Sequence, residues 1–361
     1  MQSYHIAFIP GDGVGTEVSE EAIKILAATA DKYGFQLKTE TFGWGCDYYL
    51  KRGRMMPDDM LEKLKAFDAI FLGCIGDTNK VPDHISLTLL LSIRKGFDQY
   101  VNLRPIKLYP GVDTALKNAS PSTVDMAVVR ENTEGEYSAS GGFYKLGTPD
   151  GAAIQTAIFT QKGCERVMRY AFELARKRKK LGDSPAGIVT NCTKSNALNY
   201  SMVFWDKVFD QVAQDYPDIK TDMALVDALT MWLVKNPEVF DVIVASNLFG
   251  DIITDLGAML QGGMGFAAGA NINPEKTYPS MFEPIHGSAP KYAGKGIVNP
   301  VAAIESIRMM TEHLGETEAG KDIEAALKHV LQNGDVKTRD MGGRHSTAEM
   351  GDAVKKAILG L

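Results

Sequence analysis

Apolar and polar positions alternate along the chain with two different periods. Short apolar runs at residues 5–9 and 69–72 predict buried strands. Residues 17–30 and 85–97 instead carry apolar side chains at helical spacing. The same part of the chain also contains an expected strand at 35–41 and an expected helix at 58–66. Strands that alternate with helices form parallel sheets covered by helices, so the pattern predicts an α/β fold.

The pattern changes after Arg104 and Pro105. Apolar runs at 124–129 and 154–160 are separated by a glycine-rich stretch, which predicts an antiparallel hairpin or arm. The elements expected beyond it are helices at 164–180, 201–214 and 301–314 and strands at 187–189 and 242–245. Because 361 residues are too many for one ordinary hydrophobic core, we expect two α/β domains.

Composition and charge exclude several classes of protein. The 39 basic and 45 acidic residues give a net charge of −6, which argues against nucleic acid as a partner. Hydrophobic residues at 45% and charged residues at 23% are average for globular domains and exclude disordered, collagenous and coiled-coil chains. The apolar runs are shorter than the roughly 20 residues that cross a bilayer, so we expect no membrane association and a cytoplasmic location.

Four scattered cysteines and one basic run receive structural interpretations. No CxxC pair is present, so neither a zinc site nor a disulfide framework is expected. The cysteines are Cys46, Cys74, Cys164 and Cys192. The basic run at 176–180 ends an expected helix just before Gly182, where cations complement the helix dipole.

A glycine-rich turn at residues 11–15 follows the first expected strand and opens the first helix. Glycines at such a turn allow backbone amides to approach a phosphate. The dinucleotide-binding fingerprint requires a third glycine where Thr16 stands. Taken alone, this turn fits a ligand site or a plain sharp turn equally well.

Two aspartates, Asp251 and Asp255, follow the expected strand at 242–245 and lie one helical turn apart. Their carboxylates share one helix face and repel each other unless a cation lies between them. Oxygen ligands suit Mg²⁺ or Mn²⁺. Asp227, within an apolar segment, is a candidate third ligand. The alternative interpretation is two solvated helix acids.

Three arginines, Arg94, Arg104 and Arg130, fall near the ends of expected elements. If these ends converge, as they do at the carboxyl edge of open α/β sheets, the guanidinium groups form a receptor for a substrate with two carboxylates. Surface salt bridges are the alternative for each arginine.

Two further side chains are candidates for proton transfer. Lys194 follows the expected strand at 187–189, and a lysine near a metal can accept a proton. Tyr137 lies in a loop too polar for core packing. Either side chain also fits an ordinary exposed position. His286 lies in a loop after a glycine-rich stretch and fits a ligand loop or a structural imidazole.

Read together, these motifs resemble the β-decarboxylating dehydrogenase family, which comprises isopropylmalate, isocitrate, homoisocitrate and tartrate/D-malate dehydrogenases. The similarity covers nearly the whole chain. The motifs in order are IPGDGVG at 9–15, Arg94, NLRP at 102–105, RENTEG at 130–135, residues 247–255 and HGSAP at 286–290.

The resemblance implies a two-domain isopropylmalate/isocitrate dehydrogenase-like α/β fold, which differs from a true Rossmann fold. Residues 1–99 and 262–361 would form a larger cofactor-binding domain. Residues 100–261 would form a smaller dimerisation and substrate domain that carries the antiparallel arm. Family members are homodimers with shared active sites.

The resemblance also implies roles for single residues. Arg94, Arg104 and Arg130 would bind the substrate carboxylates, and Tyr137 and Lys194 would handle protons. The implied Mg²⁺ or Mn²⁺ ligands are Asp251, Asp255 and Asp227. Asp227 and Lys194 would come from the other subunit. The implied cofactor-binding residues are His286, Gly287, Ser288, Ala289, Lys291, Tyr292 and Asn299.

The reaction expected from this assignment is oxidation of a 2-hydroxy dicarboxylic acid with hydride transfer to NAD or NADP, followed by loss of CO₂. Substrate choice is expected in the helix before Arg94, through Leu87, Thr88 and Leu90. This segment resembles the tartrate/D-malate branch, although Thr88 stands where an aromatic residue is usual. Isopropylmalate and isocitrate dehydrogenases are the alternatives within the family.

Cofactor choice is expected at Lys291 and Tyr292, which resemble the NADP-dependent isocitrate pattern, because an ammonium can pair with a 2′-phosphate. The region at 338–344 instead resembles the NAD-type members, so we expect use of both cofactors with NADP slightly preferred. A phosphate-handling transferase is disfavoured because no GxxxxGK loop is present. A non-catalytic regulatory subunit of the same fold is the remaining alternative from another class.

Overall fold

The computed structural model describes residues 2–182 and 187–360. The described chain folds as two compact units. Unit 1 comprises the described residues of Met1–Gln99, Lys107–Pro121 and Ala258–Leu361. Unit 2 comprises those of Tyr100–Ile106 and Ser122–Gly257. The cofactor-binding and dimerisation roles expected for two domains stay predictions.

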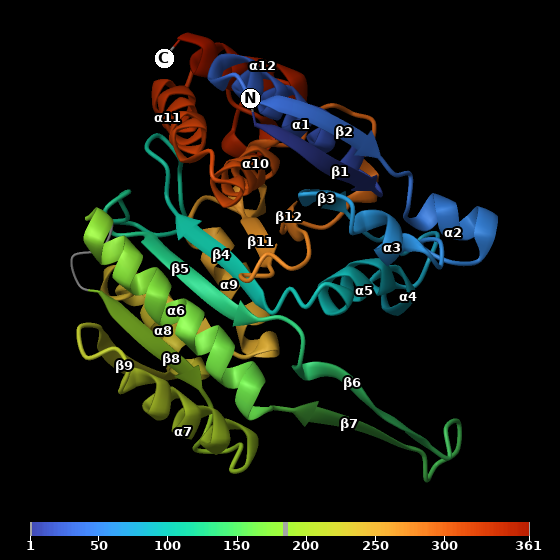
Figure 1. Cartoon of the computed structure of the whole chain (residues 1–361), viewed down its shortest axis with the longest axis vertical. Helices are drawn as coiled ribbons and strands as arrows, with labels where there is room; N and C mark the ends of the chain where they lie inside the picture. Colours follow the sequence, from blue (N-terminus) through green and yellow to red (C-terminus); the bar gives the residue numbers. More distant parts are fainter. Residues whose placement is uncertain (1, 183–186, 361) are drawn as a thin grey trace. The chain divides into compact units, whose positions relative to one another are not determined.

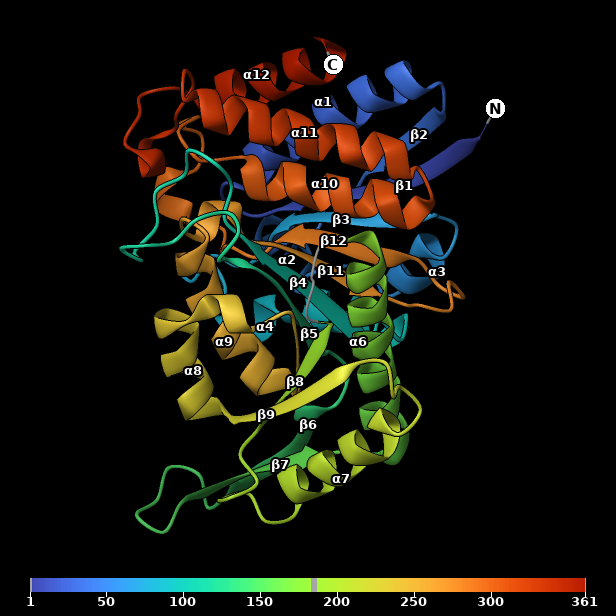
Figure 2. The same cartoon turned by 90° about the vertical axis from the view of Figure 1, so that its left-hand side faces the viewer.

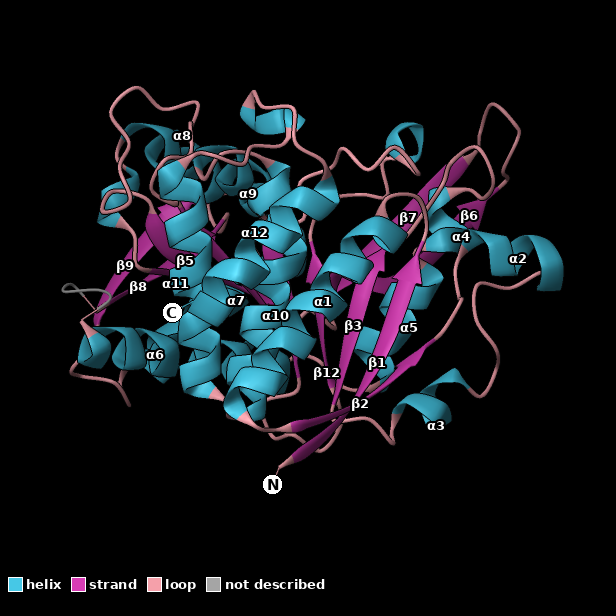
Figure 3. Ribbon diagram, turned by 90° about the horizontal axis from the view of Figure 1, so that it is seen from above, coloured by secondary structure: helices cyan, strands magenta, loops and turns pink. Residues whose placement is uncertain are grey.

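Unit 1 contains a mostly parallel run of strands in the order β2-β1-β3-β12-β11. Their bounds are β1 Ser3–Gly11, β2 Gln36–Thr41, β3 Ala69–Cys74, β11 Ala268–Ile272 and β12 Ser280–Pro284. Figure 3 shows β2, β1, β3 and β12 side by side. Only the β11–β12 pair among the recorded pairings of these strands is antiparallel. Strand β3 is buried along its whole length, as its apolar run predicts.

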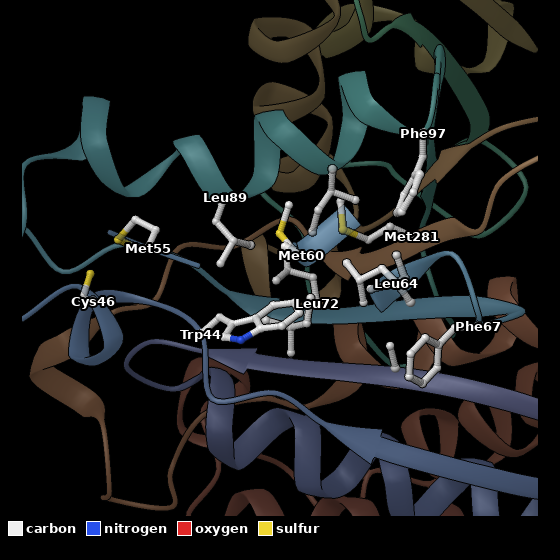
Figure 4. Packing of buried hydrophobic residues seen from close by; sticks show 14 of the residues in the cluster. Trp44, Cys46, Met55, Met60, Leu64, Phe67, Leu72, Leu89, Phe97 and Met281 are labelled. Carbon is white, nitrogen blue, oxygen red and sulfur yellow. The ribbon is translucent and has the colours of Figure 1, made fainter. Parts of the chain in front are cut away.

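Four long helices of unit 1 pack next to one another (Figure 2). They are α1 Gly15–Tyr33, α10 Val301–Leu314, α11 Thr317–Asn333 and α12 Thr347–Gly360. The shorter helices of this unit are α2 Cys46–Arg52, α3 Met60–Leu64, α4 Asp83–Ser86 and α5 Thr88–Gly96. Figure 4 shows Trp44, Met60, Leu72, Leu89 and Phe97 in the apolar cluster between these shorter helices and the sheet.

Unit 2 contains strands in the order β4-β5-β10-β8-β9. Their bounds are β4 Val101–Lys107, β5 Asp125–Glu131, β8 Ile188–Thr193, β9 Lys220–Leu225 and β10 Val242–Ala245. The associated helices are α6 Gln161–Leu181, α7 Ser201–Ala213, α8 Val226–Lys235 and α9 Asn247–Leu260. The recorded β5–β10, β10–β8 and β8–β9 pairings are parallel, so the carboxyl ends of these strands share one edge.

The predicted antiparallel arm is the hairpin of β6 Gly135–Tyr144 and β7 Ala152–Ile158, which extends outward in unit 2 (Figure 1). Several of its apolar side chains, including Phe143, Leu146 and Ile154, are exposed. Short 3-10 helices lie at Pro237–Val239, Met264–Phe266, Pro290–Tyr292 and Arg339–Met341.

The α/β class and the arm are thus confirmed, with local differences. The helix expected at 85–97 is divided at Leu87 into α4 and α5, and the helix expected at 58–66 is the five-residue α3. The four cysteines are buried and free, in agreement with the expected absence of a disulfide framework. None of the helices in the described ranges has the length and apolar character to cross a membrane.

Candidate active site

Helix α9 carries the two aspartates of the candidate metal site. The buried strand β10 ends at Ala245, and the Ser246 hydroxyl accepts a hydrogen bond from the amide of Phe249 at 3.4 Å, which caps the new helix. Asp251 and Asp255 follow on successive turns, so their carboxylates share the face predicted by their spacing.

Asp251 is the centre of the candidate site in unit 2. Its Oδ1 lies 2.5 Å from Arg130 Nη1 and 3.3 Å from Arg104 Nη2. Its Oδ2 accepts a hydrogen bond from the Tyr137 hydroxyl at 2.9 Å. Three side chains that are distant from Asp251 in sequence therefore meet at its carboxylate.

Both arginines are almost completely buried and are held by additional acceptors. Arg130 Nε and Nη2 donate to Asn247 Oδ1 at 3.2 and 2.8 Å. Arg104 Nε donates to Asn102 Oδ1, and its Nη1 donates to Thr254 Oγ1, each at 2.6 Å. Fixed orientations of this kind suit bidentate recognition of a carboxylate.

The cluster changes the proton affinities of two of its members. Burial, followed by the charge of Asp251 and the hydrogen bond to it, raises the pKa of the Tyr137 phenol. Burial and the Asp251 charge also raise the pKa of Asp255, against the opposing effect of Arg104 and Arg130. Tyr137 is therefore held in its protonated form, which a general acid requires.

The donor atoms fit a hard divalent cation only in part. Asp251 and Asp255 offer carboxylate oxygens, which Mg²⁺ and Mn²⁺ prefer. Within the part of the chain that the structure describes, no group of three acidic, histidine or cysteine side chains is suited to a metal. Asp227 consequently does not form a three-ligand set with Asp251 and Asp255 within the described residues of one chain.

Lys194 and Asp227 instead pair with each other in unit 2. Lys194 Nζ lies 2.8 Å from Asp227 Oδ1, and the Asp227 side chain is 65% exposed. The hydrogen bond from Lys194 lowers the pKa of Asp227. An exposed pair of this type contributes little to stability, so both groups remain available to a ligand or partner at small cost.

The third arginine, Arg94, lies in unit 1 on α5. Its Nη2 donates to Glu283 Oε1 at 2.8 Å, and the same oxygen accepts a hydrogen bond from Asn271 at 2.7 Å. Arg94 Nε is buried without a hydrogen-bond partner. An unpaired buried donor of this kind favours an anionic ligand.

The three residues expected to choose the substrate have different surroundings. Leu87 is exposed, and Leu90 packs against the apolar cluster of unit 1. Thr88 donates its hydroxyl hydrogen bond to the Ile85 carbonyl and lines a cavity of about 440 Å³. At 100° per residue, Leu87 and Leu90 share the helix face of Arg94, whereas Thr88 lies about 120° away from it.

The glycine turn and the HGSAP loop lie against each other in unit 1. The Val14 amide donates to the Ser288 carbonyl at 2.8 Å, and a Cβ on Gly13 would fall 2.0 Å from that oxygen. Gly13 therefore has to lack a side chain for this approach. Ala289 adopts the left-handed conformation with φ +39°, which is strained for alanine and typical of functional loops.

The other expected cofactor residues lie in or near this loop. His286 Nδ1 is 3.1 Å from the Gly287 carbonyl, its Nε2 is buried without a partner, and burial lowers the pKa of its ring. Lys291 Nζ lies 4.8 Å from the centre of the Tyr292 ring. Asn299 Nδ2 donates to Asp340 at 3.0 Å.

Sequence reasoning missed several residues that support the site. Thr254 accepts a hydrogen bond from Arg104, and Asn271 donates one to Glu283, the carboxylate partner of Arg94. A single sequence offers no signal for such contacts. Glu136 binds the start of α9. Asp12 stands between two glycines in the sequence, which is a signal for a functional turn. Its carboxylate accepts hydrogen bonds from the Cys46 and Gly76 amides.

Comparison with known proteins extends over the whole chain. The profile of the isocitrate/isopropylmalate dehydrogenase family matches residues 5–354. The chain is 48% identical to the D-malate dehydrogenase (decarboxylating) of Escherichia coli, with 99% of each chain covered. It is also 48% identical to the tartrate dehydrogenase/decarboxylase of Pseudomonas putida, with 99% of each covered.

Structural comparison gives the same family. The crystal structure of isocitrate dehydrogenase from Methylococcus capsulatus superimposes with a TM-score of 0.88 at 36% identity and covers 98% of this chain and 99% of that chain. The resemblance inferred from the motifs is therefore confirmed. The chain belongs to the isocitrate/isopropylmalate dehydrogenase family.

Proposed function

We propose that the protein catalyses the metal-dependent oxidative decarboxylation of a 2-hydroxy dicarboxylic acid of the D-malate or tartrate type, with hydride transfer to NAD(P). The reaction converts the hydroxy diacid and oxidised cofactor into a 2-oxo acid, CO₂ and reduced cofactor. The observation that carries the proposal is the convergence of Arg104, Arg130 and Tyr137 on Asp251. The names of the curated relatives supply the substrate class.

Charge balance supports a diacid together with a divalent cation. Two guanidinium groups, Arg104 and Arg130, offset the two carboxylates Asp251 and Asp255, so these side chains sum to zero charge. A dianionic substrate alone would leave two uncompensated negative charges in a partly buried site. A dication that arrives with the substrate restores neutrality.

The side chains of this chain divide the chemical work. Arg104 and Arg130 bind and orient the substrate carboxylates. Arg94 in unit 1 offers a further buried guanidinium, with an unpartnered Nε, for an anionic group. Lys194 of a second copy of the chain, in its neutral form, accepts the proton of the substrate hydroxyl as hydride leaves the carbon that bears this hydroxyl. After CO₂ is lost, Tyr137 donates a proton to the carbon from which CO₂ departed. The raised pKa of its phenol keeps Tyr137 protonated for this step.

Asp251 and Asp255 would hold Mg²⁺ or Mn²⁺ together with Asp227 of a second copy of the chain. When bound, the cation supplies Lewis-acid polarisation of the substrate oxygens and the nicotinamide supplies the hydride acceptor. The glycine turn, His286, Ser288 and Asn299 would form the adenosine site, with Gly287 and Ala289 between them. Lys291 and Tyr292 would favour NADP through the 2′-phosphate.

We further propose a homodimer with shared active sites. The described part of unit 2 exposes large apolar side chains that a second copy would cover, including Met231 and Trp232 on α8 and Ile252 on α9. A second copy would also bring Lys194 and Asp227 to the site. A cytoplasmic location and the absence of nucleic-acid and membrane partners stay predictions.

Absorbance at 340 nm tests the activity. The chain is mixed with D-malate, tartrate, isopropylmalate or isocitrate, with NAD or NADP, and with Mn²⁺ present or chelated. Reduction that requires Mn²⁺ and is fastest with D-malate or tartrate is expected. Faster reduction with isopropylmalate or isocitrate would reassign the substrate, and flat traces throughout would favour the regulatory-subunit alternative.

Mixed dimers test the shared site. Lys194→Ala and Tyr137→Phe are each expected to leave only a small, measurable residual activity. When the two variants are unfolded and refolded together, random reassortment yields mixed dimers with one intact site, so about a quarter of the wild-type activity should return. If both residues of a site came from one chain, mixing would restore nothing.

A further inference from the structure

The segment of β6 that carries Tyr137 lies in an interruption of the recorded β6–β7 backbone pairing. In the β6–β7 hairpin Gly135 pairs with Ile158, and the next recorded pair is Ser140 with Thr156. Between these pairs β6 advances by five residues (140 − 135) and β7 by two (158 − 156). Ala139 within this interval adopts φ +60°. Such an irregularity redirects side chains and removes the ladder that would locate them.

Glu136 supplies a different attachment, to the first turn of α9. Its Oε1 accepts a hydrogen bond from the Ser246 hydroxyl at 2.9 Å, and its Oε2 accepts one from the Leu248 amide at 3.1 Å. A carboxylate is favoured at this end of a helix because the amides are unpaired and the dipole is positive there. The carboxylate thus ties β6 to the beginning of α9.

The next residue of β6 binds the same helix one turn later. Tyr137 donates its hydrogen bond to Asp251 at 2.9 Å, three residues beyond Leu248. Glu136 and Tyr137, which are consecutive in β6, therefore bind α9 at two positions about one turn apart. The first attachment uses two oxygens of a single carboxylate and the second uses the phenol expected to transfer a proton.

We propose that Glu136 is a positioning residue that holds Tyr137 at hydrogen-bonding distance from Asp251 by binding the start of α9. The proposal rests on the proposed function for the role of Tyr137 in catalysis. The charged groups that face the phenol are Asp251 on α9, Arg130 on β5, whose guanidinium carbon lies 5.6 Å from the ring centre, and Glu136 itself.

A double-mutant cycle tests the catalytic consequence. Glu136→Ala removes both acceptors and is expected to lower kcat at least about tenfold, as is usual for residues that orient a functional group, with KM for D-malate changed less than about threefold. Glu136→Gln keeps one acceptor and should lose less. In the Tyr137→Phe background Glu136→Ala should cost less than about twofold more.

An equal loss in both backgrounds would overturn the proposal, because Glu136 would then act on something other than Tyr137. Glu165→Gln is the matched control. It removes a glutamate of the same unit that pairs with Arg169 on α6, and it should leave kcat unchanged. If Glu165→Gln lowered kcat as much as Glu136→Gln does, this result would also contradict the proposal.

A crystal structure of Glu136→Ala tests the geometry without any turnover. The Tyr137 hydroxyl should move out of hydrogen-bonding distance of Asp251, whereas Glu165→Gln should keep this distance near 2.9 Å. An unchanged distance in Glu136→Ala would overturn the proposal. A longer distance in a protein that is inactive with every diacid would retain the proposal and reject only the catalytic role.

Discussion

Gly250 lies beneath the side chain of Arg130: a Cβ at position 250 would fall 2.5 Å from Arg130 Cγ. Gly250→Ala is therefore expected to displace the guanidinium from Asn247 and Asp251 and to lower kcat/KM for the diacid by about 100-fold. The free energy of unfolding should fall by at most about 2 kcal/mol, because overpacking of about 1–3 kcal/mol is partly offset by the better helix propensity of alanine. Steady-state kinetics and thermal unfolding measure the two effects.

Gly257→Ala in the same helix is the control for this prediction. A Cβ there would meet Ile106 Cδ1 at 2.3 Å, which concerns packing and no arginine. This variant should lose thermal stability and keep most of its kcat/KM. Equal kinetic losses in the two variants would contradict the role given to the Gly250 contact.

Cation binding is expected to depend on Asp255. Burial and the Asp251 charge raise its pKa, so protons compete with a divalent cation at higher pH than at an ordinary aspartate. The affinity for Mn²⁺ should fall as pH decreases through this raised pKa and recover above it. Calorimetric titration with Mn²⁺ between pH 8 and pH 4 measures this dependence.

Asp255→Asn should weaken Mn²⁺ binding at least about tenfold and make the affinity less dependent on pH. The same slope in the variant would contradict the assignment.

Lys291 is expected to contribute to the preference for NADP. Lys291→Ala removes the ammonium beside Tyr292 and should lower kcat/KM for NADP about tenfold while kcat/KM for NAD stays within about twofold. Lys295→Ala is the control, since Lys295 Nζ lies over the same ring at 5.8 Å. A hundredfold preference of the unmodified enzyme for NAD would reject this prediction.

Acid should destabilise unit 1 through His313. Burial, with the nearby charge of Lys276, lowers the pKa of His313 to about 4, and its ring packs against Phe282. Between an unfolded pKa near 6.5 and this value only the unfolded state binds the proton, so the free energy of unfolding should fall as pH drops from 6.5 to 4.

At about 1.4 kcal/mol per unit of pKa shift, this loss reaches a few kcal/mol at pH 4. His313→Gln should make the urea midpoint less dependent on pH in this range. His84→Gln, at an exposed position, should leave the dependence as it is. An unaltered pH dependence in His313→Gln would show that other groups cause the acid sensitivity.

Much of the fold could be predicted from periodicity because buried strands and amphipathic helices leave local patterns. The β3 run and the glycine-rich arm are examples. Strand β9 was missed because its residues are mostly exposed and its alternation is weak. The return of Lys107–Pro121 to unit 1 was also missed, since it depends on distant packing such as that of Gly111 against the Leu331 carbonyl.

The candidate site was predictable to the extent that its residues have distinctive chemistry and spacing. Asp251 and Asp255 satisfy the helical spacing read from the sequence, and Arg104, Arg130 and Tyr137 join them in unit 2. The pairing of Lys194 with Asp227 was not expected. The hydrogen bond from the Thr88 hydroxyl to the Ile85 carbonyl was not predicted either. It depends on the position at which α4 ends and α5 begins, which sets the direction of the side chain.

The mutual cancellation of charge around Asp251 has a thermodynamic consequence. Whatever factor the cation contributes to the affinity of the diacid, the diacid must contribute to the affinity of the cation, since linkage between two equilibria is reciprocal. Either ligand alone finds an electrostatically compensated cluster and gains little from it. Saturation with one ligand should therefore shift the binding isotherm of the other to lower concentration, and by the same factor in either direction.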